Sequence, residues 1–372
     1  MLLASFFFVA AAVNAAETLS LAGEWQFQLD SANAGVKERW FSNPLTDTIT
    51  LPGSTDEAGK GKVNGPELGQ SGRLMRAFEY VGPAWYQREV DVPAGWVGKQ
   101  IRLFLERAHW ESRLWIDDQE IGMQDSLSVP HKFDLTGKLA PGRHRLTLRV
   151  DNTIKIKVGQ WAHSVCDETM GNWNGIIGRI ELRAFDPVFL ENVRVGSDLT
   201  KNRLWVDGII RNADTGTVTC VVRKKAGALV LLQGRTELAA ANSFRMELPL
   251  DGKLALWDEF TPNLYLAEVT LETRSGKSTV SIPFGVREFA ARDRQFVING
   301  RPVFLRGNLT GGEFPLTGHF PMDEAGWERV IRVMKSCGLN SGQADRSPVR
   351  QRGDKRAVLG YGLHHSVMIQ PP

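Results

Sequence analysis

The sequence is short of the residues that cross-link small secreted domains or hold metal ions. It has three cysteines and seven histidines among 372 residues, and Cys166, Cys220 and Cys337 lack the close spacing of zinc ligands. Three cysteines cannot all pair within one chain, so we expect most of them to be buried free thiols. The histidines, including the adjacent His364 and His365, form no ligand pattern either. The sequence therefore indicates no metal site and no other cofactor.

The sequence also lacks an apolar run long enough to span a bilayer. Residues 1–13 are apolar, but they are fewer than the ~20 residues that a spanning helix needs. The run ends in Val13-Asn14-Ala15-Ala16, whose small residues resemble the cleavage site of an export signal. We therefore expect residues 1–16 to be a signal peptide and the protein to be periplasmic or extracellular. A buried N-terminal segment is the alternative.

An excess of charge is absent except at the C-terminal end. The chain has 45 Lys and Arg against 42 Asp and Glu, and residues 341–372 hold five of the basic residues and two of the acidic residues. Residues 1–340 therefore carry equal numbers of basic and acidic residues, which predicts no nucleic-acid-binding face on the folded part. Residues 341–372 show neither a helical nor a strand period. We expect an aberrant, disordered terminus, with a basic nucleic-acid-binding arm as the alternative.

What the sequence does contain is a long series of short strands separated by turn residues. Between Leu19 and Leu182, apolar and polar residues alternate in several segments; in one of them Trp25, Phe27 and Leu29 share a face. Such alternation predicts sheets with one buried face, and we expect an antiparallel jelly roll over residues 17–187. Five further strand-like segments follow the Asp186-Pro187 boundary. They favour an immunoglobulin-like β-sandwich over residues 188–286.

Residues 287–340 have a different pattern. An apolar strand over residues 301–307 is followed by an amphipathic helix over residues 322–338, with Asp323 as its N-cap and Gly338 as its stop. One strand and one helix are the first unit of a (β/α)₈ barrel, which needs about 250 residues and carries its chemistry at the C-terminal ends of its strands. Only residues 341–372 follow. We therefore expect an incomplete TIM barrel that leaves the apolar face of this helix exposed.

The order of these parts resembles glycoside hydrolase family 2, the β-galactosidase and β-glucuronidase family. The resemblance covers about residues 19–340, and residues 172–180 look most like its secreted β-galactosidase-like branch. Five motifs that follow one another at the family's spacing carry it: Trp85 to Arg88, Phe133 to Asn152, Gly175 to Gly178, Phe284 to Arg287 and Phe304 to Gly307. The resemblance implies a jelly-roll sugar-binding domain, an immunoglobulin-like domain and a catalytic barrel, in that order.

The resemblance also implies hydrolysis of β-glycosides with retention, which needs two carboxyl groups about 5–5.5 Å apart. In the family both are glutamates on the barrel, and the acid/base follows an asparagine. This sequence contains no Asn-Glu dipeptide, and the strand that carries the nucleophile lies beyond its end. We therefore expect no catalytic residue in the chain, which resembles a part of the family fold that ends early in the barrel.

Substrate-binding residues are implied at two places. The family's sugar-contacting loop corresponds to residues 165–175, where Asp167, Asn172 and Asn174 offer polar side chains and Trp173 offers a stacking face. The structural alternative is that Asp167 forms a turn and Trp173 is core. Arg306 and Asn308 lie at the end of the predicted first barrel strand. Arg306 could instead pair with a core carboxylate.

Three functions remain open from the sequence. The first is a family member that acts on β-galactosides or related β-glycosides but whose 372 residues lack the catalytic machinery. The second is a non-catalytic carbohydrate-binding module that uses the jelly roll. The third is a remnant whose exposed half-barrel surface causes aggregation or degradation. In the first two the expected partner is a carbohydrate, and the sequence identifies neither the sugar nor its linkage.

Overall fold

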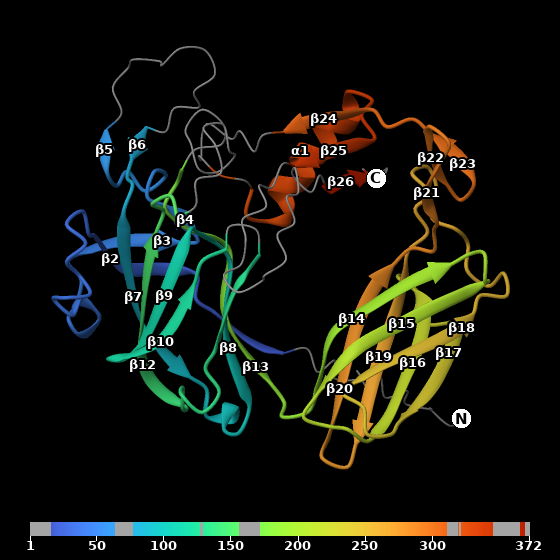
Figure 1. The fold of residues 1–372 in the computed structure, drawn as a ribbon, viewed down its shortest axis with the longest axis horizontal. Helices are drawn as coiled ribbons and strands as arrows, with labels where there is room; N and C mark the ends of the chain where they lie inside the picture. The colour runs from blue at the N-terminus through green and yellow to red at the C-terminus, as the bar shows by residue number, and fades with distance from the viewer. Residues whose placement is uncertain are drawn as a thin grey trace, which may run out of the picture. The chain divides into compact units, whose positions relative to one another are not determined.

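A computed structural model describes residues 16–63, 77–126, 129–155, 172–310, 319, 321–344 and 365–368. The described residues are mainly β, with a single α-helix of 13 residues among them. They divide into two compact units, one made chiefly of residues 18–184 and 305–370 and the other of residues 185–304 (Figure 1). None of the described helices is long and apolar enough to cross a membrane.

The first unit contains a sandwich of two sheets. The six-stranded sheet has the order β10-β9-β12-β7-β2-β3, and the other sheet has the order β1-β13-β8-β11, with β4 paired to β13. A short hairpin of β5 (Lys62–Val63) and β6 (Phe78–Glu79) stands apart from both sheets. The strands of the sandwich are β1 (Glu17–Ser20), β2 (Gly23–Leu29), β3 (Asp47–Leu51), β4 (Gly53–Ser54), β7 (Pro83–Val92), β8 (Gln100–His109), β9 (Glu111–Ile116), β10 (Gln119–Gln124), β11 (His131–Asp134), β12 (Gly142–Asp151) and β13 (Gly175–Phe185).

The core of this sandwich follows from the alternation in its strands. Trp25 and Phe27 of β2 are buried and Leu29 packs at the edge of the same cluster, as the alternation predicted. Strand β7 is buried on both faces, because Tyr86 enters the main core while Trp85 enters a small aromatic cluster on the other side. There Trp85 stacks on Trp115 with ring centroids 5.0 Å apart. Burial of both faces accounts for the consecutive apolar residues Pro83 to Tyr86 at the start of β7.

The second unit contains a smaller sandwich with a three-stranded sheet, β14-β15-β18, and a four-stranded sheet, β17-β16-β19-β20. Its core is a separate cluster that includes Val206, Cys220 and Val269. Two of its seven strands, β17 and β20, were not among the five expected segments. The strands are β14 (Phe189–Asp198), β15 (Arg203–Arg211), β16 (Gly216–Lys224), β17 (Val230–Leu238), β18 (Ser243–Pro249), β19 (Tyr265–Thr273) and β20 (Gly276–Phe284).

The expected strand over residues 301–307 is observed only for residues 301–303, and it does not begin the barrel-like unit. Strand β23 (Arg301–Val303) instead pairs antiparallel with β22 (Gln295–Ile298), which pairs with β21 (Phe289–Arg292). The two residues that join β22 to β23, Asn299 and Gly300, have φ of 50° and 80°. An Asn-Gly pair with positive φ at both positions is a strong hairpin signal, and it takes residues 301–303 into this small sheet.

The barrel-like pattern begins at Gly307. Strand β24 (Gly307–Thr310) leads to α1 (Glu324–Ser336), and β25 (Ser341–Ala344) then pairs in parallel with β24. The Asp323 side chain accepts a hydrogen bond from the Gly326 N–H at 2.8 Å, which confirms the predicted N-cap. Gly338 has a φ of 75° just beyond the helix, as expected for a C-terminal stop. The observed elements are one β–α–β unit, and a TIM barrel is not confirmed.

The predicted disordered tail is wrong for the residues that the structure describes. β25 lies within it, and β26 (His365–Met368) pairs antiparallel with β25. The sequence Ser341-Gly-Gln-Ala344 has almost no apolar content, so pairing of the backbone with β24 forms this strand without a periodic signal. Residues 345–364 and 369–372 lie outside the described residues, as do residues 1–15 of the predicted signal peptide.

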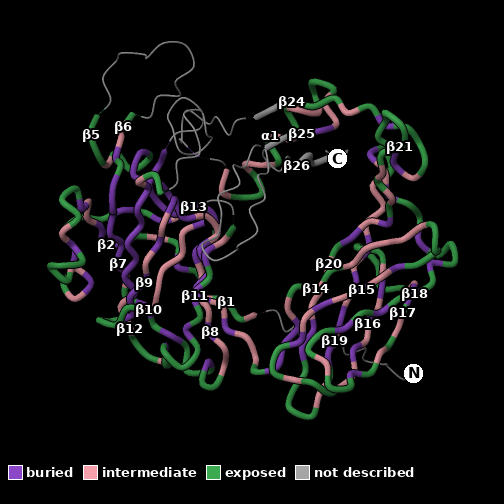
Figure 2. Tube along the Cα trace, viewed as in Figure 1, coloured by how far each residue is buried: buried purple, intermediate pink, exposed green. Residues whose placement is uncertain are grey.

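Burial differs sharply between the sandwiches and the helix. Buried residues fill the interior of each sandwich in Figure 2, whereas α1 is drawn only as intermediate or exposed. No residue of α1 is buried, and Val333 is 58% exposed. Cys220 is a buried free thiol as predicted, but Cys337, at the end of α1, is a free thiol that is exposed.

Candidate functional site

The three residues before β13 form the described part of the predicted sugar-contacting loop. Asn172, Trp173 and Asn174 are all buried, and their backbone is held from two sides. The Asn152 side-chain amide donates to the Asn172 carbonyl oxygen at 2.8 Å. The Thr55 N–H donates to the Asn174 carbonyl oxygen at 2.8 Å. These bonds fix the start of β13 to Asn152, 20 residues before Asn172, and to Thr55, which lies more than one hundred residues earlier in the chain.

The side chain of Asn174 belongs to the protein interior. Its Nδ2 donates to the carbonyl oxygen of Gly82 at 2.8 Å and to that of Val150 at 3.3 Å. Its Oδ1 accepts a hydrogen bond of 2.9 Å from the Tyr86 hydroxyl. Burial raises the pKa of Tyr86 well above its ordinary value, so this hydroxyl stays protonated and donates. These bonds occupy the whole amide, which favours a structural role for Asn174 over the predicted sugar contact.

Trp173 lies in a cluster of aromatic side chains from three parts of the chain. Its ring meets the His109 ring edge-on with centroids 4.6 Å apart. On another side, the His319 ring lies 6.3 Å away at an interplanar angle of 61°. His109 ends strand β8, and His319 precedes α1. Because edge-to-face packing orients aromatic rings, these two histidines fix the plane of Trp173.

His319 also connects the segment before α1 to the first sandwich. Its Nε2 lies 3.1 Å from Oε2 of Glu57. The hydrogen bond from His319 holds the pKa of Glu57 below its ordinary value, and the positive charge of His319 acts in the same direction, although partial burial opposes both. Arg107 makes a second connection, because its Nη2 donates to the Pro321 carbonyl oxygen at 3.2 Å. Both contacts lie within the first unit.

A polar hollow of about 450 Å³ lies next to this cluster, along the edge strand β3 and the turn that carries Glu57. Hydroxyl groups and charged groups line it together, and its charged and hydroxyl side chains are Glu24, Thr48, Thr50, Ser54, Glu57 and Lys60. Lys60 is paired with Asp47 at 2.6 Å, and this pair lowers the pKa of Asp47. Carboxylates and hydroxyls supply the donors and acceptors that sugar hydroxyls need.

The remaining predicted site residues are not brought into this cluster by any described contact. Arg306 is exposed, and its Nε donates to the Gly338 carbonyl oxygen at 2.8 Å, so it connects the start of β24 to the end of α1. It pairs with this carbonyl and with no carboxylate in the described residues. Asn308 lies in β24, but its side chain lies outside the described residues, and so does Asp167. Their contact with a sugar stays a prediction.

Glu57, His109 and His319 were not predicted from the sequence. No local motif could have indicated them, because Glu57 and His319 are 262 residues apart in the chain. His109 follows a strand pattern that was recognised, yet nothing in the pattern marks its ring as a neighbour of Trp173. Tertiary packing alone brings the three together.

The described fold defines a class, a chain with two antiparallel β-sandwiches followed by a β–α–β unit. Residues 18–184 match the model described as glycosyl hydrolases family 2, sugar binding domain. These residues therefore contain the sugar-binding domain of glycoside hydrolase family 2, which confirms the resemblance drawn from the motifs.

Similar proteins agree with this assignment. A β-glucuronidase of Paenibacillus borealis is 21% identical over 93% of this chain and 58% of its own length. Beta-galactosidase 2 of Enterobacter cloacae is 23% identical over 88% of this chain and 33% of its own length. The chain thus spans about half, or less, of these relatives.

Solved structures show the same fold at low identity. A β-glucuronidase from an uncultured Clostridium species has a TM-score of 0.68 and 22% identity, over 91% of this chain and 56% of that one. The β-glucuronidase of Ruminococcus gnavus in complex with D-glucuronic acid has a TM-score of 0.70 and 17% identity, over 88% of this chain and 55% of that one. Similarity at this level of identity establishes the fold.

Proposed function

We propose that the first sandwich is the sugar-binding part of a family 2 β-glycosidase and that Trp173 borders its carbohydrate site. The observation that carries this proposal is the location of the Trp173 cluster inside the region that matches the family's sugar-binding domain. The aromatic ring supplies an apolar face, and the neighbouring hollow supplies carboxylates and hydroxyls. A sugar has both kinds of surface, so this combination suits it.

The domain organisation is part of the same proposal. The division of the first sandwich into two antiparallel sheets supports the jelly-roll interpretation over residues 17–187. Seven strands divided three and four support an immunoglobulin-like domain over residues 188–286. The β–α–β unit supports the start of a catalytic barrel after it. We also propose that residues 1–16 direct export, on the sequence pattern alone.

The substrate class comes from the relatives, which are named as β-glucuronidases and a β-galactosidase. We therefore propose a β-glucuronide or a β-galactoside as the ligand of the complete site. The 372 residues contain no Asn-Glu dipeptide, and retaining hydrolysis needs two carboxyl groups on either side of the scissile bond. We propose that these residues bind the sugar without hydrolysing the glycosidic bond.

A second candidate is a non-catalytic carbohydrate-binding module. The observation in its favour is that the hollow beside β3 is lined entirely by the first sandwich. Against it, α1 leaves apolar side chains such as Val333 exposed, and soluble proteins avoid extended apolar patches. The first proposal accounts for both observations, because a catalytic barrel would cover that helix.

Ligand-observed NMR and titration calorimetry on the full chain test the proposal. Each hydroxyl contact contributes about 0.5–1.5 kcal/mol, while association costs about 4 kcal/mol or more, so we expect millimolar or weaker binding of glucuronic acid or galactose. Trp173→Ala should remove the binding of the neutral sugar galactose, and Trp173→Phe should retain part of it. Phe260→Ala, at a ring that is 70% exposed in the second unit, is the matched control. Galactose binding that Trp173→Ala leaves unchanged would contradict the proposal.

A further inference from the structure

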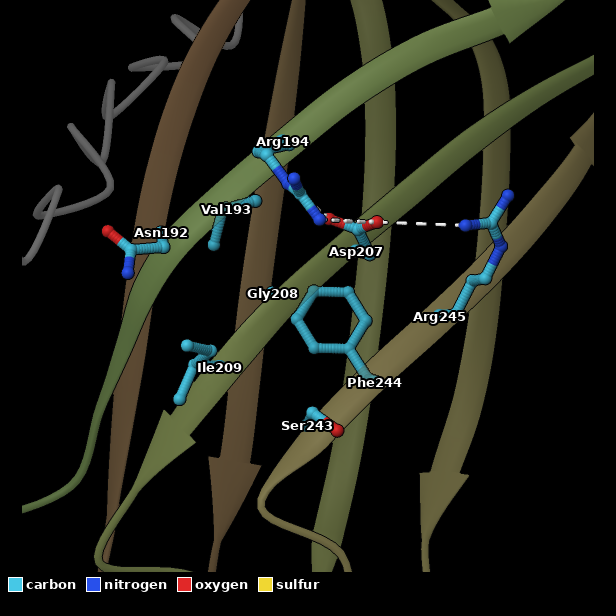
Figure 3. Close-up of a pocket in the computed structure, with 9 residues that line it drawn as sticks. All are labelled: Asn192, Val193, Arg194, Asp207, Gly208, Ile209, Ser243, Phe244 and Arg245. Atoms are coloured by element: carbon cyan, nitrogen blue, oxygen red, sulfur yellow. Dashed lines mark hydrogen bonds and ion pairs between the residues drawn. The ribbon is translucent and has the colours of Figure 1, made fainter. Parts of the chain in front are cut away.

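The second sandwich carries a hollow of its own on the β14-β15-β18 sheet. Its volume is about 880 Å³, and residues of all three strands line it. Figure 3 shows the Phe244 ring beside Gly208, with Arg194, Asp207 and Arg245 along one side of the ring and Ser243 on the other. The hollow belongs to residues 185–304 alone and shares no lining residue with the hollow beside β3.

Two local features of the backbone form this hollow. The pairing of β14 with β15 shifts register between Glu191 and Arg194, and Asn192 within the shift has a φ of 53°. A bulge of this kind redirects side chains from a regular sheet. On the next strand, a Cβ on Gly208 would lie 2.8 Å from Cε1 of Phe244, so a larger residue does not fit. The Phe244 ring is itself buried in the core of the second sandwich, so it lies beneath the hollow beside Gly208.

The charged groups along this side are unequal in number. Arg194 makes two hydrogen bonds to the Asp207 carboxylate, at 2.9 and 3.2 Å, and Arg245 lies 3.7 Å from the same carboxylate. Glu247 lies 3.9 Å from Arg245 and 3.9 Å from Arg203. Three guanidinium groups therefore face two carboxylates, which leaves one surplus positive charge.

Arg245 is the group that can receive a ligand. Among the described residues its guanidinium makes only these two long ion pairs and lies over the Trp205 ring, 5.4 Å from the centroid. Its side chain is 59% exposed. Asp207 is already neutralised by its paired bonds with Arg194, so it opposes an anion near Arg245 only weakly. A guanidinium presents five N–H donors in a geometry that matches a carboxylate.

We propose that this hollow is a second carbohydrate site, selective for an acidic sugar. The sugar carboxylate would bind Arg245, with hydroxyl groups on the Asn192 amide and the Ser243 hydroxyl. A C–H face of the sugar ring would lie against the Ile209 side chain, which lines the hollow. A carboxylate, hydroxyls and an apolar ring face are combined in a uronic acid, whereas a neutral hexose lacks the charged group. This site does not depend on the proposed function of the first sandwich.

Titration calorimetry on the full chain, with methyl β-glucuronide as the probe and methyl β-glucoside as its neutral counterpart, tests the site. To separate it from the Trp173 cluster, the titrations are repeated in Trp173→Ala and in Trp173→Phe. We expect methyl β-glucuronide to bind in both backgrounds, and Arg245→Gln to weaken it by about 10-fold, since a charge-assisted bond is lost. Methyl β-glucoside lacks the carboxylate, so its affinity for the wild type should be low. That affinity should not exceed the affinity of methyl β-glucuronide for the Arg245→Gln variant.

Arg235→Gln is the matched control, because Arg235 is an exposed arginine on β17 that pairs with Glu237 at 2.6 Å. It should leave the affinity for methyl β-glucuronide unchanged. The proposal is overturned if Arg245→Gln binds the glucuronide as well as the wild type does, or if both Trp173 variants lose all binding while remaining folded. Sedimentation that shows a self-association removed by Arg245→Gln, without glucuronide binding, would assign the hollow to a second copy of the chain instead.

Discussion

The two sandwiches and the β–α–β unit bury their apolar residues to very different extents. Each sandwich encloses a continuous core, which contains large side chains such as Trp25 in one and Tyr265 in the other. Helix α1 has an N-cap, a C-terminal glycine and an apolar face, yet none of its residues is buried. An isolated helix of 13 residues is marginal in water without tertiary packing. Each sandwich therefore has its own packed core. Helix α1, in contrast, is stabilised mainly by its caps, and its apolar face is not buried against the described residues.

The largest effect should come from a cavity in the first core. Leu148 of β12 is fully buried, so Leu148→Ala should lower the free energy of unfolding by about 2–5 kcal/mol. Val333→Ala on α1 should change it by less than about 0.5 kcal/mol. Urea titrations of both variants measure the contrast. Equal losses at the two positions would mean that α1 contributes to a packed core.

The free thiols provide a second comparison. Burial raises the pKa of Cys220 to about 12, so its reactive thiolate is scarce at pH 8, whereas Cys337 is exposed. In a Cys166→Ser variant we expect one thiol to react with a disulfide reagent at least ~100-fold faster than the other. Mass spectrometry of the labelled protein should assign the fast thiol to Cys337. Fast labelling of Cys220 would show that the second core opens readily.

The next effect concerns the buried amide of Asn174. Removing it leaves the Tyr86 hydroxyl and the carbonyl oxygens of Gly82 and Val150 without these bonds. Unsatisfied buried groups cost about 1–3 kcal/mol, so Asn174→Ala should lower the free energy of unfolding by that amount. Asn242→Ala, at an exposed position, serves as the control in the same urea titration. A neutral Asn174→Ala would return this residue to the list of candidate sugar contacts.

The smallest effect should come from the contact between His319 and Glu57. The lowered pKa of Glu57 means that its stabilising contribution is present above the ordinary carboxyl pKa and is lost as the pH falls through the lower pKa of the folded state. The carboxylate is partly exposed, so Glu57→Gln should cost less than about 1 kcal/mol at pH 7. The difference from the wild type should disappear as the pH falls below the lowered pKa of Glu57. Constant destabilisation by Glu57→Gln across this pH range would contradict the assignment.

The sequence predicts the sandwiches well because alternation and turn residues are local signals. Trp25 and Phe27 are buried as their pattern indicated, and the motif that begins at Trp85 lies in β7, at the centre of its sheet. The family resemblance is confirmed by the match over residues 18–184. The Asn299-Gly300 pair is a local turn signal that indicates the hairpin between β22 and β23.

The candidate site was much less predictable. Trp173 was predicted, and the structure gives its ring two histidine neighbours. Asn174 was predicted as a sugar contact because it lies in the same loop, yet its side chain points into the protein. In a short irregular segment, the direction of a side chain depends on tertiary contacts, which the sequence does not show. Strand β25 was missed because backbone pairing, which is independent of side-chain pattern, forms it.

We propose that sugar binding and hydrolysis reside in different parts of the family fold, with the binding part in the first sandwich. The most direct test is turnover of aryl β-glucuronide and aryl β-galactoside by the purified chain. Retaining hydrolysis requires a pair of carboxyl groups about 5–5.5 Å apart, and the account therefore predicts release of aryl alcohol no faster than in buffer. Saturable turnover that co-purifies with the protein and persists in a preparation from a host without glycosidases would contradict it.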